Sequence, residues 1–169
     1  MGLFSFLKNA GISLGRKKGE QEKTIEKSNA AAGNEAMDKL ANSQMAMRLT
    51  NYVVQLGLKV ENLNIEVDGE KAMVQGKTNS KEEKEKVILA VGNVEGIATV
   101  DDRISVEEEM PAPEAAFYEV KKGDTLSAIS KKYYGNANRY REIFEANRPM
   151  LADPDKIYPG QMLRIPQEN

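Results

Sequence analysis

The last fifty residues constrain the fold of this chain most, because two extended patterns there frame two short helical ones. The opening stretch reads Tyr118-Glu-Val-Lys-Lys-Gly-Asp-Thr-Leu-Ser-Ala-Ile-Ser, and the closing stretch reads Ile157-Tyr-Pro-Gly-Gln-Met-Leu-Arg-Ile-Pro. Asp124 and Thr125 have side chains that cap helices, and Gly135 is a typical helix end. The pattern predicts a strand, two amphipathic helices and a closing strand that pairs with the first.

This region resembles a LysM domain, a module named for binding the sugar polymers of cell walls. The resemblance covers residues 117–167 and rests on Gly123-Asp-Thr-Leu, on Asn147 and on Pro159-Gly-Gln-x-Leu-x-Ile-Pro. It implies a β-α-α-β domain. It also implies a glycan-binding groove between two loops, at the positions Gly123, Asp124, Thr125 and Leu126 on one side and Ile157, Tyr158, Pro159 and Gly160 on the other.

The middle of the chain predicts a second small domain. Apolar residues at helical spacing predict a helix over 35–56, and Asp68-Gly69 between two alternating runs predicts a β-hairpin. Ser80-Lys-Glu-Glu is a capping box, and the helix that it starts ends at Gly92, before a strand over 97–106. Residues 35–107 resemble a BON domain, which implies the order α-β-β-α-β.

The expected fold class is therefore α+β, with two small domains in sequence. An acidic, proline-containing linker over 108–116 joins the BON-like domain to the LysM-like domain. A polar linker over 12–34 precedes the BON-like domain. Residues 1–11 form a short apolar segment that we predict to be a helix ending at Gly11. Its large apolar side chains are costly to expose, so we expect it to dock on the BON-like domain.

Composition excludes several classes of function. The chain has no histidine and no cysteine, which removes the commonest general base, the thiol nucleophile and the usual zinc ligands. With 24 basic and 26 acidic residues, no basic excess points to nucleic acid. No recognisable nucleophile motif occurs, so we expect a binding protein and no enzyme. No secretory signal or membrane-spanning run is evident, so we expect a cytoplasmic location and no membrane span.

Taken as a whole, the chain resembles the bacterial cytoplasmic potassium-binding proteins, which combine a BON domain with a LysM domain. This resemblance implies that K⁺ is the ligand, that the protein is a monomer and that it compacts on binding. Neutral carbonyl dipoles suit this large monovalent ion, and helix C-termini offer them. The implied ligands are the backbone carbonyls of Leu7, Ala10, Ile12, Gly92, Val94 and Ile97.

Three further expectations accompany this interpretation. Leu7 and Ile12 depart from the family's side chains, which main-chain ligands tolerate. We expect Gly92 to have a positive φ, as glycines that end helices often do. The alternative function is binding of peptidoglycan, or fragments of it, through the LysM-like groove.

Overall fold

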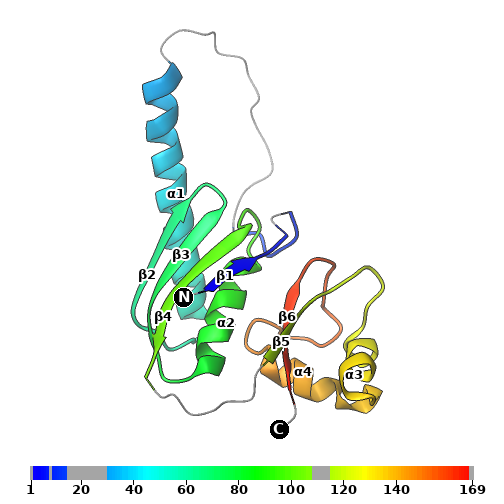
Figure 1. Cartoon of the computed structure of the whole chain (residues 1–169). Helices are drawn as coiled ribbons and strands as arrows, with labels where there is room; N and C mark the ends of the chain where they lie inside the picture. The colour runs from blue at the N-terminus through cyan, green and yellow to red at the C-terminus, as the bar shows by residue number, and fades with distance from the viewer. Residues whose placement is uncertain (1, 8, 15–29, 108–114, 168–169) are drawn as a thin grey trace.

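A computed structural model describes residues 2–7, 9–14, 30–107 and 115–167 and gives two α+β domains, as predicted (Figure 1). Most of the predicted linkers, residues 15–29 and 108–114, lies outside the described residues. The BON-like domain contains β1 (Gly2–Ser5), α1 (Ala30–Gln55), β2 (Glu61–Asp68), β3 (Lys71–Thr78), α2 (Lys81–Gly92) and β4 (Thr99–Val106). The LysM-like domain contains β5 (Ala115–Glu119), α3 (Leu126–Tyr134), the 3₁₀ turn η1 (Ala137–Arg139), α4 (Tyr140–Ala146) and β6 (Met162–Pro166).

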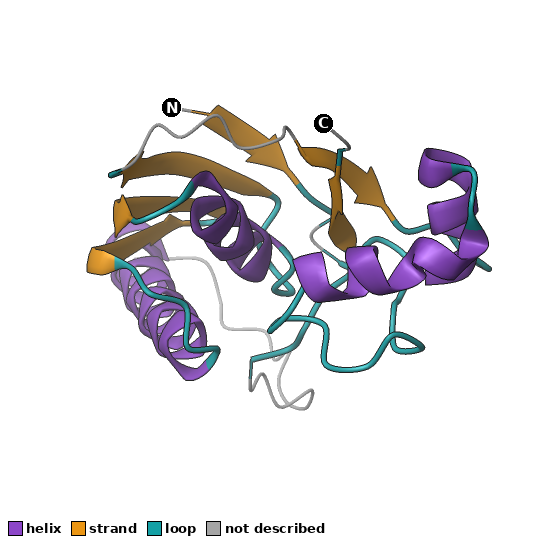
Figure 2. Cartoon of the chain, turned by 90° about the horizontal axis from the view of Figure 1, so that it is seen from below, coloured by secondary structure: helices purple, strands orange, loops and turns teal. Residues whose placement is uncertain are grey.

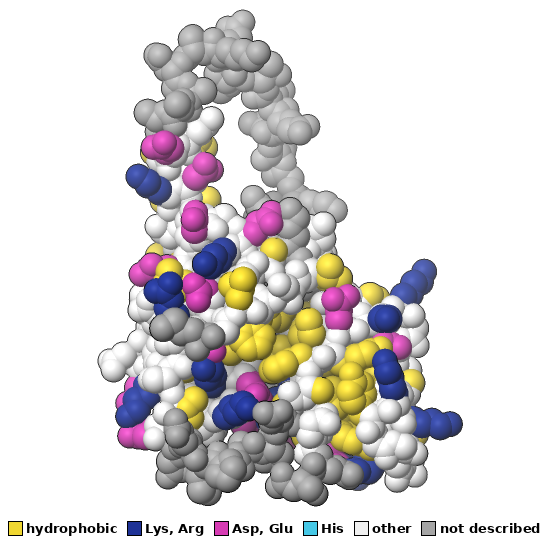
Figure 3. All heavy atoms as spheres, in the orientation of Figure 1, with side chains coloured by type: hydrophobic (Ala, Val, Ile, Leu, Met, Phe, Trp, Pro, Cys, Tyr) yellow, Lys and Arg dark blue, Asp and Glu magenta, His cyan; other side chains and the backbone are white. Residues whose placement is uncertain are grey.

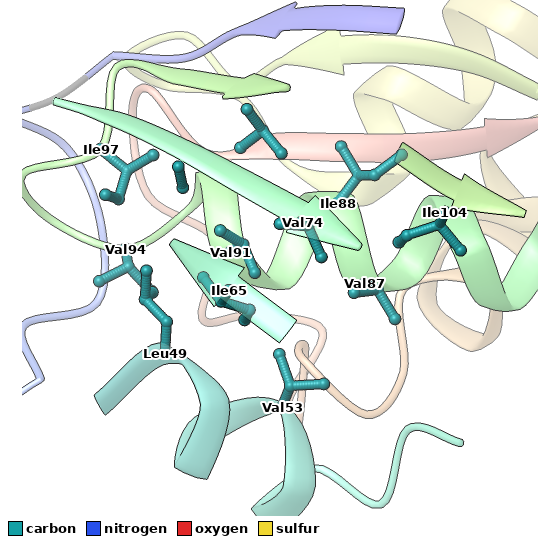
Figure 4. Packing of buried hydrophobic residues seen from close by; sticks show 12 residues of the cluster. Leu49, Val53, Ile65, Val74, Val87, Ile88, Val91, Val94, Ile97 and Ile104 are labelled. Carbon is teal, nitrogen blue, oxygen red and sulfur yellow. The ribbon is translucent and has the colours of Figure 1, made fainter. Parts of the chain in front are cut away.

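The four strands of the BON-like domain form one sheet in the order β1-β4-β3-β2. β2 and β3 form the predicted antiparallel hairpin, and β3 and β4 are parallel partners connected through α2. Both helices lie on the same face of the sheet (Figure 2). That face is closed by a core of aliphatic side chains from α1, α2, the strands and the turn after α2 (Figure 4).

Local sequence signals determine where these elements begin and end. Gly69 has a φ of 57° in the hairpin turn, a conformation that glycine adopts without steric cost. The Ser80 side chain accepts a hydrogen bond from Glu83 N at 3.2 Å and so caps α2. Thr125 caps α3 in the same way through Ala128 N, and Gly135 ends α3 in the left-handed conformation.

The prediction of a helix at the N-terminus is wrong, because residues 2–5 form an edge strand. β1 pairs antiparallel with β4, and beyond it Phe6 N donates to Ala98 O at 2.8 Å. Phe4 and Phe6 face the core, whereas Leu3 and Leu7 are 67% and 48% exposed. This alternation has period two, which is the strand period. The free edge of β4 provides the hydrogen bonds that a short helix would have had to make by itself.

Helix α1 begins at Ala30, earlier than predicted, and its two halves differ in packing. Residues 33–41 are all exposed and extend beyond the sheet, whereas Leu49 and Val53 are buried in the core (Figure 1). None of the helices in the described part of the chain is both long and apolar enough to cross a membrane.

Candidate functional site

The segment after β1 lies along the turn that follows α2. Ile12 N donates to Asn93 O at 2.8 Å, Glu95 N donates to Ile12 O at 3.1 Å, and Ile12 and Val94 form a parallel β-bridge. The side chains of Val94 and Ile97 are fully buried in the core of the BON-like domain and fix the turn to it (Figure 4). The structure thus brings Leu7 and residues 9–12 together with residues 92–97, although they are about eighty positions apart in the sequence.

Two glycines make this close approach possible. A Cβ atom on Gly11 would lie 2.4 Å from Asn93 O, and one on Gly92 would lie 2.1 Å from Cζ of the Phe6 ring. The expectation of a positive φ at Gly92 is wrong, because Gly92 is the last residue of α2 and Asn93, with a φ of −82°, follows as its C-cap. Gly92 is instead required because a side chain there would occupy the place of the Phe6 ring.

The six predicted carbonyls fall into two groups. Leu7 O accepts from Ala10 N at 3.0 Å, Ile12 O from Glu95 N, and Val94 O from Ile97 N at 3.2 Å. The other three, those of Ala10, Gly92 and Ile97, accept no hydrogen bond from any other described residue. Each carbonyl has two lone pairs, so acceptance of one hydrogen bond still leaves one lone pair for a cation.

Within the described ranges, no group of three or more acidic side chains is placed to hold a metal ion. The place where the N-terminal segment, up to Ile12, meets the turn over 92–97 is the junction. A cation site in this junction would consist of main-chain oxygens at the C-terminal end of α2, where the helix carries partial negative charge.

The LysM-like domain closes the junction from its other side. Gly160, with a φ of 86°, lies so close to the N-terminal segment that an added Cβ would be 2.4 Å from Ala10 Cβ and 3.1 Å from Leu7 Cδ1. The Tyr158 hydroxyl donates to Asn93 O at 3.4 Å, and burial raises the pKa of this phenol to about 12. Hydrophobic side chains gather where the two domains meet and over the LysM-like domain (Figure 3).

Further contacts between the domains are polar and specific. Arg164 Nε donates to Glu85 Oε2 at 2.7 Å, and both side chains are 7% exposed. Asn93 Nδ2 donates to Met162 O, and Met162 N donates to Asn93 Oδ1. The rings of Phe4 and Phe117 add an edge-to-face contact at 5.6 Å. Sequence reasoning missed these partners, since a buried Asn or Arg gives no local signal of what it binds.

The predicted glycan groove has two unlike sides. On the first side, Asp124 accepts from Lys121 N and from the Tyr118 hydroxyl, both at 2.8 Å, and these bonds lower the pKa of its carboxyl. Thr125 caps α3 there, and Leu126 is buried in the domain core. On the second side, Tyr158 and Gly160 contact the chain itself through Asn93 and the N-terminal segment. Glycan binding by this groove stays a prediction.

Comparisons with known proteins agree with the domain order. The model of the BON domain matches residues 43–108, and the model of the LysM domain matches residues 118–166. The potassium binding protein Kbp of Escherichia coli O6:H1 is 46% identical over 169 residues, covering 99% of this chain and all of that protein. An uncharacterized protein of Deinococcus radiodurans is 49% identical over 29% of this chain and 19% of its own length. An esterase of Mycobacterium tuberculosis is 39% identical over 38% of this chain and 14% of its own length.

Proposed function

Because this chain belongs to the family of the potassium binding protein Kbp, with a BON domain followed by a LysM domain, we propose that it binds K⁺. The ion would lie where the N-terminal segment meets the turn after α2. Its ligands would be the backbone carbonyls of Leu7, Ala10, Ile12, Gly92, Val94 and Ile97.

The observation that carries this proposal is the set of unused carbonyls in the junction. Those of Ala10, Gly92 and Ile97 accept no hydrogen bond from the described residues. The N-terminal segment and the turn over 92–97, which carry them, are nevertheless held together by main-chain hydrogen bonds. Unpaired carbonyls are costly when they are kept from water, and a large monovalent cation satisfies several at once. Among the described residues of the two segments, α2 contributes the helix end, since residues 2–5 form a strand.

The same geometry supports a sensing role in which K⁺ binding compacts the protein. The turn over 92–97 contacts the N-terminal segment on one side and the LysM domain on the other. A ligand that fixes this turn would favour the docked arrangement, because it binds that arrangement better than an open one. We propose that the protein acts in this way as a cytoplasmic monomer and without catalytic activity.

Calorimetry and small-angle scattering on the purified chain, titrated with KCl or NaCl at matched ionic strength, test this function. We expect binding heat and a smaller radius of gyration with KCl and little response to NaCl, because Na⁺ requires a tighter cage. Equal responses to both salts would refute a selective K⁺ site. Light scattering at each end of the titration tests whether the protein remains a monomer.

The alternative function is binding of peptidoglycan fragments through the LysM domain. The family match of residues 118–166 supports it. In the docked arrangement, however, Gly160 faces the N-terminal segment and Tyr158 contacts Asn93. A pull-down with insoluble peptidoglycan, with and without KCl, separates the two functions. Strong binding that persists in KCl and is lost in Tyr158→Ala would favour the alternative.

A further inference from the structure

Asn93 is the residue at which the candidate ion site and the LysM domain meet. It follows Gly92 directly, and its backbone N–H donates to Leu89 O at 2.9 Å at the end of α2. Its carbonyl accepts from Ile12 N and from the Tyr158 hydroxyl. Its main chain is therefore held by α2, by the N-terminal segment and by the LysM domain at once.

The Asn93 side chain adds a second connection, with two hydrogen bonds to a single residue. Nδ2 donates to Met162 O at 2.9 Å, and Met162 N donates to Oδ1 at 2.8 Å. The amide thereby bonds both main-chain polar groups of Met162, the first residue of β6, as a residue of a paired strand would. Asn93 is only 5% exposed, so both Met162 groups would lose their partners if the amide were removed.

We infer that Asn93 is the positioning residue that couples the ion-binding turn to docking of the LysM domain; this inference rests on the proposed function. The orientation of the side chain is set by the backbone of the turn over 92–97. A cation that fixes the turn therefore also fixes the amide that receives Met162. By linkage, docking of the LysM domain should raise K⁺ affinity by the same factor by which K⁺ raises the equilibrium constant for docking. Such factors are typically about 5- to 150-fold.

The chemistry of the amide suggests a test by Asn93→Asp. A carboxylate accepts from Met162 N but cannot donate to Met162 O, so docking should fail in this variant. The backbone carbonyls of Gly92 and Val94 remain, so K⁺ binding should persist.

The measurement is the distance between two dyes in the full-length chain. The sequence has no cysteine, so Glu66→Cys on β2 and Lys131→Cys on α3 provide two unique labelling positions on exposed residues. Asn51→Asp is the matched control, because it makes the same chemical change on an exposed part of α1. Calorimetry on each protein reports K⁺ binding separately from docking.

We expect the dye distance to shorten with K⁺ in the labelled wild type and in Asn51→Asp. Asn93→Asp should bind K⁺ without this shortening. Shortening by Asn93→Asp overturns the coupling role. Loss of both heat and shortening also overturns it, since the residue would then serve the ion site alone. A wild type that gives no K⁺ heat refutes the proposed function itself.

Discussion

The substitution Gly92→Ala tests whether docking of the N-terminal segment is part of the K⁺ site. The new methyl group would lie 2.1 Å from Cζ and 2.3 Å from Cε1 and Cε2 of the Phe6 ring. Carbon atoms in contact prefer separations of about 3.5–4.0 Å, so the ring must leave its place. Phe6 is half-buried and packs against the core of the BON domain. Its displacement should therefore loosen the segment that carries Leu7, Ala10 and Ile12.

The magnitude follows from the burial of this ring. Complete burial of a phenylalanine side chain contributes about 1.5–3 kcal/mol, and the half-buried ring should contribute about 1–2 kcal/mol. If K⁺ binds only the docked segment, affinity should fall by about 5- to 30-fold, since each 1.4 kcal/mol is a factor of ten. Calorimetric titration with KCl measures this change directly.

A matched control separates the steric effect from helix propensity. Alanine stabilises a helix interior by about 0.5–1 kcal/mol relative to glycine. Gly33 lies in α1 with no atom within 4 Å of an added Cβ, so Gly33→Ala should leave K⁺ affinity unchanged. Phe6→Leu combined with Gly92→Ala should recover part of the affinity, because it makes room for the methyl group. Wild-type affinity in Gly92→Ala alone would refute the reasoning.

Three further predictions concern the domains and their interface. Glu85→Gln leaves the Arg164 guanidinium buried without its carboxylate, and loss of one partner in a buried pair costs about 3–5 kcal/mol. Small-angle scattering should therefore show that the domains open, and an unchanged radius of gyration would contradict this. Asn147→Ala removes three buried hydrogen bonds, with Ile143 O, Arg164 O and Arg164 N, at a cost of about 2–4 kcal/mol. The LysM domain should therefore unfold first in urea, and a single unshifted transition would argue against this. Deletion of residues 1–11 should abolish K⁺ binding while circular dichroism shows both domains folded, and a full K⁺ response in this variant would exclude the N-terminal segment from the site.

The elements that the sequence predicted well are those whose signals are local. The Asp68-Gly69 turn, the Ser80 and Thr125 caps and the Gly135 helix end all depend on residues within four positions of each other. Each of these features appears in the structure where the residues predicted it.

The N-terminal segment was predicted as a helix because its strand partner is far away in the sequence. Gly2 pairs with Asp102 and Phe4 with Val100, so nothing near Phe4 reveals the available edge of β4. In the sequence the alternation is masked, because the exposed neighbours Leu3 and Leu7 are apolar as well. The predicted ligand carbonyls are brought together by the same distant pairing, but their role as ligands came from resemblance to a family. The coupling role of Asn93 depends on Met162, which no sequence pattern connects to it.

The polar character of the domain interface has a consequence for how the chain is made. The turn over 92–97 leaves the ribosome before residues 158–164, which are added several seconds later at roughly 5–20 residues per second. During that interval Asn93 and Glu85 face water, which satisfies an amide and a carboxylate as readily as their later partners do. The polar groups of the nascent BON domain thus need no protein partner before the LysM domain is made, and the contacts of Asn93 with residues 158–162 form last.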